Sequence, residues 1–143
     1  MQTKIFTVAE ANAVLERVVR AAADRLAELI AAVEALKTEI EVTRLVVGTG
    51  ASESNPDRAA LARLEQRHRE LEVEVREEIE AVQAAGGLIK DARSGLVDFF
   101  SILDGKLVFL CWKRGEDRIR YWHPVVEGYR GRRPLTIRAP REE

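Results

Sequence analysis

The feature that most constrains this chain is the stretch of residues 7–46, which contains neither glycine nor proline. Within it, apolar residues recur every three or four positions, at Val8, Ala11, Leu15, Val18, Ala22, Leu26, Leu29, Val33, Leu36 and Ile40. This spacing predicts one long helix with a coiled-coil-like seam, which is interrupted once, at Ala22 to Leu26, by two successive steps of four. Thr7 and Glu10 have the spacing of a capping box, so we expect the helix to begin there.

A second helix is expected over residues 56–85. Residues 48–55 are mostly loop formers, Asn55 followed by Pro56 is typical of a helix start, and Gly86-Gly87 is typical of a helix end. The apolar stripe of this helix comprises Leu61, Leu64, His68, Leu71, Val75, Ile79 and Val82. The two helices are therefore expected to form an antiparallel hairpin, and His68 is interpreted as a packed imidazole rather than a ligand.

The first helix also carries apolar residues off its seam, at Val14, Val19, Ala23, Ile30 and Val42. Because a two-helix hairpin buries only one stripe from each helix, these side chains need a further partner. That partner is either the sheet of the same chain or the hairpin of a second copy. We expect a homodimer.

Residues 88–123 change from helical to alternating hydrophobicity and predict an antiparallel sheet of three or four strands. Asp104-Gly105 predicts one tight turn, and Gly115-Glu116 is taken as the tip of a second. These turns set the expected cross-strand pairs: Phe100 with Phe109, Asp98 with Cys111, Cys111 with Arg120, and Phe109 with Trp122. The fold class is therefore α+β, a long helical hairpin followed by an antiparallel β-meander.

The expected register sorts the side chains onto two faces. The face expected to pack on the helices carries Val97, Phe99, Val108, Leu110, Trp112, Ile119, Tyr121 and His123. The other carries Asp98, Phe100, Phe109, Cys111, Lys113, Arg118, Arg120 and Trp122. We expect this second face to be covered by a dimer mate or by the last twenty residues, with Asp98 and Arg120 paired beside Cys111. The alternative is a pocket with Trp122 and Phe109 as walls, in which Arg118 and Arg120 bind an anion.

On this register Cys111 and His123 lie on opposite faces, so they are not expected to form a nucleophile pair or a metal site. Cys111 is the only cysteine, which excludes an intramolecular disulfide and a multi-cysteine metal centre. A weak pair between His123 and Glu127 is the remaining option in the loop that follows. No metal and no cofactor are expected.

The composition, 46% hydrophobic with a net charge of -1, predicts one globular domain over residues 1–143. A cytoplasmic location is expected because neither a signal segment nor a membrane-spanning apolar run is visible, and no membrane partner is expected. The C-terminal segment, residues 124–143, is basic and includes Arg132 and Arg133. Binding of single-stranded nucleic acid is compatible with it but is not our expectation, because the alternation at residues 136–138 favours a short docked strand.

The segments "KIFTVAEANAVL", "GLVDFFSILDGKLVFLCWKRGEDRIRYWH" and "EGYRGRRPL" resemble the bacterial domain of unknown function 2203 family over nearly the whole chain. The specific matches are Asp98, Cys111, Trp112, Gly115, Glu116, Trp122, His123, Gly128 and Pro134. The family has no established activity. The resemblance implies a helical hairpin with a sheet, and it implies that the sheet and the "WHPVVEGYRGRRPL" segment hold the shared chemistry.

Three functional hypotheses remain. The favoured one is a non-catalytic, dimeric interaction or scaffold protein, with the helix seams available to a protein partner. The second is a small-anion-binding protein or enzyme with a site on the sheet and residues 123–134. The third is single-stranded nucleic-acid binding. The candidate site residues are Asp98, Cys111, Glu116, Arg120, Trp122, His123, Glu127, Arg132 and Arg133.

Overall fold

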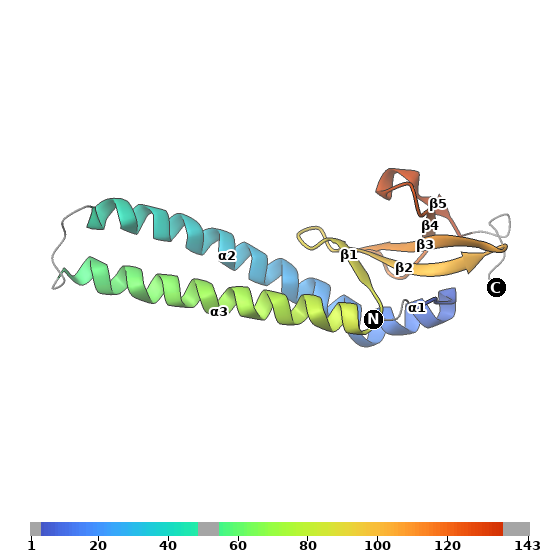
Figure 1. Ribbon diagram of the computed structural model, residues 1–143, viewed down its shortest axis with the longest axis horizontal. Coiled ribbons are helices and arrows are strands. Elements are labelled where there is room, and N and C mark those ends of the chain that lie inside the picture. Colours follow the sequence, from blue (N-terminus) through green and yellow to red (C-terminus); the bar gives the residue numbers. More distant parts are fainter. Residues whose placement is uncertain (1–3, 49–54, 136–143) are drawn as a thin grey trace. The chain divides into compact units, whose positions relative to one another are not determined.

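The computed structural model describes residues 4–48 and 55–135 of the chain. The helices precede a five-stranded antiparallel sheet in the order β1-β2-β3-β4-β5, which confirms the α+β class and adds strands to the three or four expected (Figure 1). The strands are β1 (Leu88–Asp91), β2 (Leu96–Leu103), β3 (Lys106–Lys113), β4 (Tyr121–Pro124) and β5 (Arg133–Pro134). None of the helices in the described ranges combines the length and hydropathy that a membrane span needs.

The chain forms two compact units. The sheet unit contains the chain up to Ala27 and from Glu78 onward, and the hairpin unit is Glu28–Glu77. The sheet unit is therefore built from two distant parts of the sequence, with the hairpin unit between them in chain order.

The first helical stretch is continuous but not uniform. It consists of α1 (Val8–Val14), a π-helical turn η1 (Leu15–Val19) and α2 (Arg20–Val47). The expected capping box is present, because the Glu10 amide donates to Thr7 Oγ1 at 3.1 Å and the Thr7 amide donates to Glu10 Oε1 at 2.8 Å.

The π turn changes which residues of this stretch are buried. Its hydrogen bonds span five residues instead of the four of an α-helix, which shifts the face that follows, and Val19 is buried where the seam predicted Val18. The irregularity thus falls at Leu15–Val19, one turn before the expected interruption at Ala22 to Leu26.

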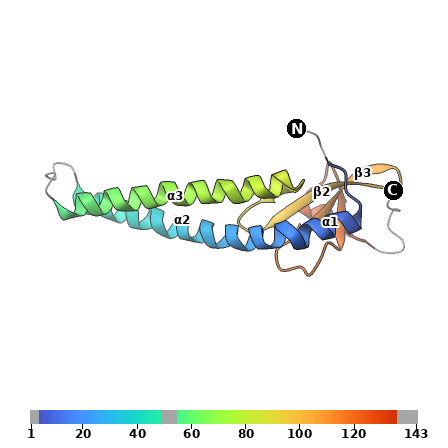
Figure 2. The same cartoon turned by 90° about the horizontal axis from the view of Figure 1, so that it is seen from below.

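The core of the sheet unit lies between one face of the sheet and the helical segment that begins with α1 (Figure 2). Leu15, Val19, Phe99, Leu110 and Trp112 are completely buried there. Three of the off-seam apolar residues, Val14, Val19 and Ala23, belong to this cluster, so the sheet of the same chain is their partner. Ile30 and Val42 lie in the hairpin unit and are outside the cluster.

The hairpin unit pairs the rest of α2 with the first part of α3 (Pro56–Ala84), and the two helices lie side by side (Figure 1). Its buried residues are Leu29, Leu36, Ile40 and Leu71. An ion pair between Arg44 on α2 and Glu65 on α3, 2.7 Å long, joins the two helices. The Asn55 side chain accepts the Asp57 amide at 2.8 Å, as expected for a residue at the helix start. The rest of the expected loop, residues 49–54, lies outside the described residues.

The register between β2 and β3 is the expected one. Asp104 and Gly105 both have positive φ, 54° and 76°, which gives a tight turn whose twist suits a two-residue hairpin. Phe100 is opposite Phe109 and Asp98 is opposite Cys111. A direct link from the N-terminal segment is the Phe6 amide, which donates to the Phe100 carbonyl at 2.7 Å.

The expected register between β3 and β4 is wrong by one residue. Cys111 is opposite Tyr121 rather than Arg120, and Phe109 is opposite His123 rather than Trp122. Because side chains alternate along a strand, this slip turns every side chain of β4 to the other face. Trp122 therefore packs against the core on the helix side, and His123 lies on the face that carries Cys111.

The slip arises because residues 114–120 form a wide connection rather than a two-residue turn. The Glu116 side chain accepts the Lys113 amide at 2.7 Å, and the Glu116 carbonyl accepts the Trp112 indole N–H at 3.0 Å. Further along, the Ile119 amide donates to Asn12 Oδ1 at 2.8 Å, which ties the connection to α1. The expected strand at residues 136–138 lies outside the described residues.

Candidate functional site

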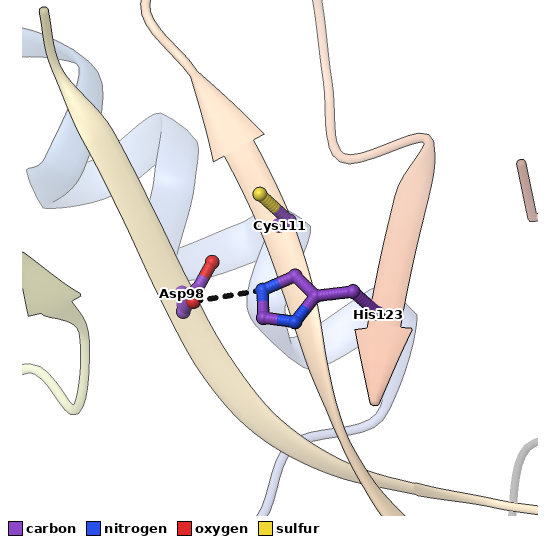
Figure 3. Close-up of side chains that lie close together, drawn as sticks. All are labelled: Asp98, Cys111 and His123. Carbon is purple, nitrogen blue, oxygen red and sulfur yellow. Dashed lines mark hydrogen bonds and ion pairs between the residues drawn. The ribbon is translucent and has the colours of Figure 1, made fainter. Parts of the chain in front are cut away.

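Three buried side chains from three neighbouring strands meet on the sheet face turned away from the helices. Asp98 comes from β2, Cys111 from the opposite position on β3, and His123 from β4 (Figure 3). Their relative exposures are 2%, 0% and 2%, and their potential ligand atoms all lie within 4.8 Å of one another. The expectation that Cys111 and His123 lie on opposite faces is wrong, because the slip in β4 brings them together.

The imidazole of His123 is held at both nitrogens. Nδ1 lies 2.8 Å from the Pro124 carbonyl oxygen, and Nε2 lies 3.0 Å from Asp98 Oδ2. A carbonyl oxygen only accepts hydrogen bonds, so Nδ1 carries a proton. The hydrogen bond between Nε2 and Asp98 Oδ2 needs one further proton, which is carried by either the imidazole or the carboxyl group.

The second carboxylate oxygen of Asp98 differs from the first in its hydrogen bonding. Asp98 Oδ1 is buried and has no hydrogen-bond partner within the described part of the chain. Since an unpaired buried carboxylate oxygen costs free energy, this atom needs an explanation.

Cys111 is a protonated thiol in this arrangement. Burial, followed by the nearby Asp98 carboxylate, raises the pKa of Cys111 to about 12, against a smaller opposing effect of Arg132. A reactive cysteine needs the thiolate at neutral pH. Because neither nitrogen of His123 is bonded to the sulfur, the trio does not form a Cys–His nucleophile in the sense of a general base on a thiol.

The surroundings of the trio are apolar and aromatic. The Phe109 ring lies 5.4 Å from the His123 ring and 4.5 Å from the Phe100 ring, centroid to centroid. Lys90 lies over Phe109 at 4.7 Å. The trio and Phe109 are thus shielded from solvent, although Lys90 beside them is exposed.

Arg132 anchors the C-terminal segment beside the trio. Its guanidinium donates to the Cys111 carbonyl at 3.2 Å and to Glu116, and it lies over the rings of Tyr121 and Tyr129 at 4.0 and 4.7 Å. The short helix η2 (Tyr129–Gly131) lies on the side of the sheet opposite α1 (Figure 1). The expectation that residues of the C-terminal segment reach this face is therefore confirmed for Arg132.

The other predicted site residues are elsewhere. Arg120 pairs with Asp117 at 2.8 Å rather than with Asp98, and this hydrogen bond lowers the pKa of Asp117 to about 2. Glu127 pairs with Arg133 at 3.3 Å rather than with His123.

The anion pocket that was the alternative does not form as expected. Phe109 and Trp122 lie on opposite faces of the sheet, so they cannot be two walls of one pocket. Arg118 and Arg120 instead line a shallow hollow of about 210 Å³ beside Asn12 and Ile119.

One sequence signal pointed to the correct register. Trp122 is a larger apolar side chain than either of its neighbours, Tyr121 and His123, and larger apolar residues belong in the helix-facing core. Placing Trp122 in that core would have moved His123 beside Cys111.

These features define an α+β protein whose sheet unit buries an Asp–Cys–His group. The chain belongs to a family described as an uncharacterized conserved protein, DUF2203, whose model matches residues 4–135, and this confirms the resemblance seen in the sequence. A search of curated proteins and a search of solved structures gave no significant match.

Proposed function

We propose that this protein is a cytoplasmic, non-catalytic interaction protein that works as a homodimer through its hairpin unit. The observation that carries the proposal is the incomplete core of that unit. Only Leu29, Leu36, Ile40 and Leu71 are buried among its described residues. Four neighbours on the same seams, Val33, Leu61, Leu64 and Val75, are only half-buried.

The end of α2 exposes a larger apolar surface, the α2 end patch of Val42, Leu45 and Val46. Their side chains are 54%, 83% and 63% exposed. Positions i, i+3 and i+4 are neighbours on one helix face, so the three form a continuous patch. Burial of apolar surface contributes about 25 cal/mol per Å² of favourable free energy, so packing of a second hairpin on this patch would stabilise a dimer.

A second copy is the partner that best fits this surface. Two hairpins packed side by side give a four-helix arrangement in which half-buried seams of both copies become interior. A two-fold interface needs only one self-complementary patch on the chain. The sheet face, the other dimer surface expected from the sequence, is less suited because its Asp98, Phe109 and Cys111 are already buried within one chain.

The proposal of a non-catalytic role is supported by the chemistry of the buried trio. The Cys111 thiol is protonated at neutral pH, and both nitrogens of His123 are already bonded. The basic side chains of the C-terminal segment favour a structural role over nucleic-acid binding, because Arg132 pairs with Glu116 and Arg133 with Glu127.

Sedimentation equilibrium at tens of micromolar tests the dimer. The expected mass is about 32 kDa, twice the 16.1 kDa of one chain. Leu45→Glu is expected to shift the protein to the monomer mass, because it places a charge in the centre of the α2 end patch. Val126→Glu is the matched control: Val126 is 95% exposed but lies in the sheet unit, so it should leave the dimer intact.

Two results would contradict the proposal. One is a wild-type protein that sediments as a 16.1 kDa species at this concentration. The other is a dimer that persists in Leu45→Glu and is lost in Val126→Glu, which would move the interface to the sheet unit.

A further inference from the structure

The buried trio has the donor set of a transition-metal site. Cys111 supplies sulfur, His123 nitrogen and Asp98 oxygen, and one ligand atom from each lies within 4.8 Å of the other two. Such a mixed set suits zinc and neighbouring divalent transition metals, whereas magnesium and calcium prefer oxygen ligands only.

The distances are compatible with an ion after small side-chain movements. Donors around a tetrahedral zinc ion at roughly 2.0–2.3 Å lie roughly 3.3–3.7 Å from one another. His123 Nε2 and Asp98 Oδ2 are 3.0 Å apart, already slightly closer than this. The sulfur needs to approach by no more than about an ångström, which rotation about the Cys111 Cα–Cβ bond and the Asp98 side chain can provide.

Two observations besides the cluster itself point to a ligand. The first is the orientation of His123: its Nδ1–H donates to the Pro124 carbonyl, which leaves Nε2 as the atom aimed at the cluster. Metal-binding histidines are commonly oriented by a backbone carbonyl in this way. The second is Asp98 Oδ1, a buried acceptor without a partner in the described residues, which a cation would satisfy.

Charge balance favours a divalent ion at this place. Because the three side chains are buried, an unpaired charge on one of them is costly and needs compensation. When metal binding ionises the Cys111 thiol, its thiolate and the Asp98 carboxylate together carry two negative charges, which a divalent cation neutralises. Arg132, a cation beside the trio, is already paired with Glu116.

We propose that Asp98, Cys111 and His123 together bind one divalent transition-metal ion, Zn²⁺ by the chemistry of the donors, and that this ion joins β2, β3 and β4. Three protein ligands leave one position of a tetrahedral ion open, and the burial of all three ligands shields the ion from bulk solvent. This site lies in the sheet unit and does not depend on the dimer proposed above.

The experiment uses the full chain, freed of metal with a chelator and then titrated with Zn²⁺ or Co²⁺. We expect one equivalent to bind, with a rise in the melting temperature of the sheet unit. With Co²⁺ we expect a thiolate-to-cobalt charge-transfer band, and Cys111 is the only cysteine that can produce it. Binding should release a proton, because the Cys111 thiol must ionise to bind.

Variants locate the site. Cys111→Ser should abolish the charge-transfer band, and both Cys111→Ser and His123→Gln should weaken Zn²⁺ binding by at least about 100-fold. His68→Gln is the matched control, since the sequence has only two histidines and His68 lies on α3 with Glu72 at 2.9 Å. It should bind Zn²⁺ as the wild type does.

The proposal is overturned if the wild-type protein shows no charge-transfer band with Co²⁺, and this result requires no variant to fold. It is also overturned if Cys111→Ser binds Zn²⁺ as tightly as the wild type, or if His68→Gln loses binding while His123→Gln retains it. Circular dichroism of each variant confirms that it is folded before its affinity is compared.

Discussion

Replacing Asp98 by alanine in the metal-free protein tests whether the Asp98–His123 pair stabilises the sheet unit. The hydrogen bond between Asp98 Oδ2 and His123 Nε2 is 3.0 Å long and both side chains are 2% exposed. Removing one partner of a buried ion pair costs about 3–5 kcal/mol when the other charge is left unpaired. A neutral imidazole avoids that cost, because Nδ1 of His123 keeps its bond to the Pro124 carbonyl and only Nε2 loses its partner.

The remaining cost is that of a buried, unsatisfied Nε2, about 1–3 kcal/mol, and it is reduced by removal of the unpartnered Oδ1. We therefore expect Asp98→Ala to lower the free energy of unfolding by about 2 kcal/mol. Asp98→Asn should cost less than about 1 kcal/mol, because its amide can donate to the bare Nε2. The matched control is Asp24→Ala, which breaks an exposed pair with Arg114 and should cost about 0–1 kcal/mol.

Urea unfolding followed by tryptophan fluorescence is the appropriate assay. Both tryptophans, Trp112 and Trp122, lie in the sheet unit, so the signal reports on that unit and not on the hairpin unit. The reasoning is refuted if Asp98→Ala and Asp24→Ala cost the same, or if Asp98→Asn is as destabilising as Asp98→Ala.

Three further predictions concern single contacts or groups of the sheet unit. In the metal-free protein, the free energy of unfolding should fall by up to about 1.4 kcal/mol per pH unit above pH 9, because the pKa of the Cys111 thiol is near 9.0 in the unfolded chain and about 12 in the folded one. Urea unfolding of Cys111→Ala at pH 8–11 should lack this fall, and equal pH dependence of the variant and the wild type would contradict the prediction. Asn12→Ala leaves the buried Ile119 amide without its acceptor and should cost about 1–3 kcal/mol by fluorescence-monitored unfolding, so a loss below about 0.5 kcal/mol would contradict the role assigned to Asn12. Thr7→Ala removes the cap of α1 and should cost about 0.5–2 kcal/mol, with faster hydrogen exchange at the Glu10 amide; unchanged exchange there would show that the cap is dispensable.

Local signals in the sequence were sufficient for the parts of the fold that local contacts determine. The capping box at Thr7 needs only residues three apart, and the Asp104-Gly105 turn sets the β2–β3 register through its own backbone conformation. The helix limits and the Asp98–Cys111 pairing followed from such signals.

The β3–β4 register could not be obtained in this way because long-range contacts set it. The connection over residues 114–120 is shaped by Asn12, more than a hundred positions earlier in the chain, and by the Glu116 side chain folded back on the backbone. A two-residue turn was the simpler interpretation, and its error of one residue separated His123 from Cys111. The sequence pattern therefore indicated Asp98, Cys111 and His123 as candidates and placed Asp98 beside Cys111 correctly, but it put His123 on the opposite face.

The division of the sheet unit between two distant parts of the chain also bears on how fast the protein folds. Contacts such as Ser101 Oγ to the Phe6 carbonyl and Ile119 to Asn12 join residues 95 and 107 positions apart. If the hairpin unit forms first, its residues no longer count toward the loop that these contacts must close, and the loop is shortened by about half. Halving a loop lowers the entropic barrier by only about 0.6 kcal/mol, which speeds closure roughly threefold. Early formation of the hairpin unit then speeds folding only modestly. The slow step remains the joining of residues 6–12 to residues 95 and 107 positions later in the chain.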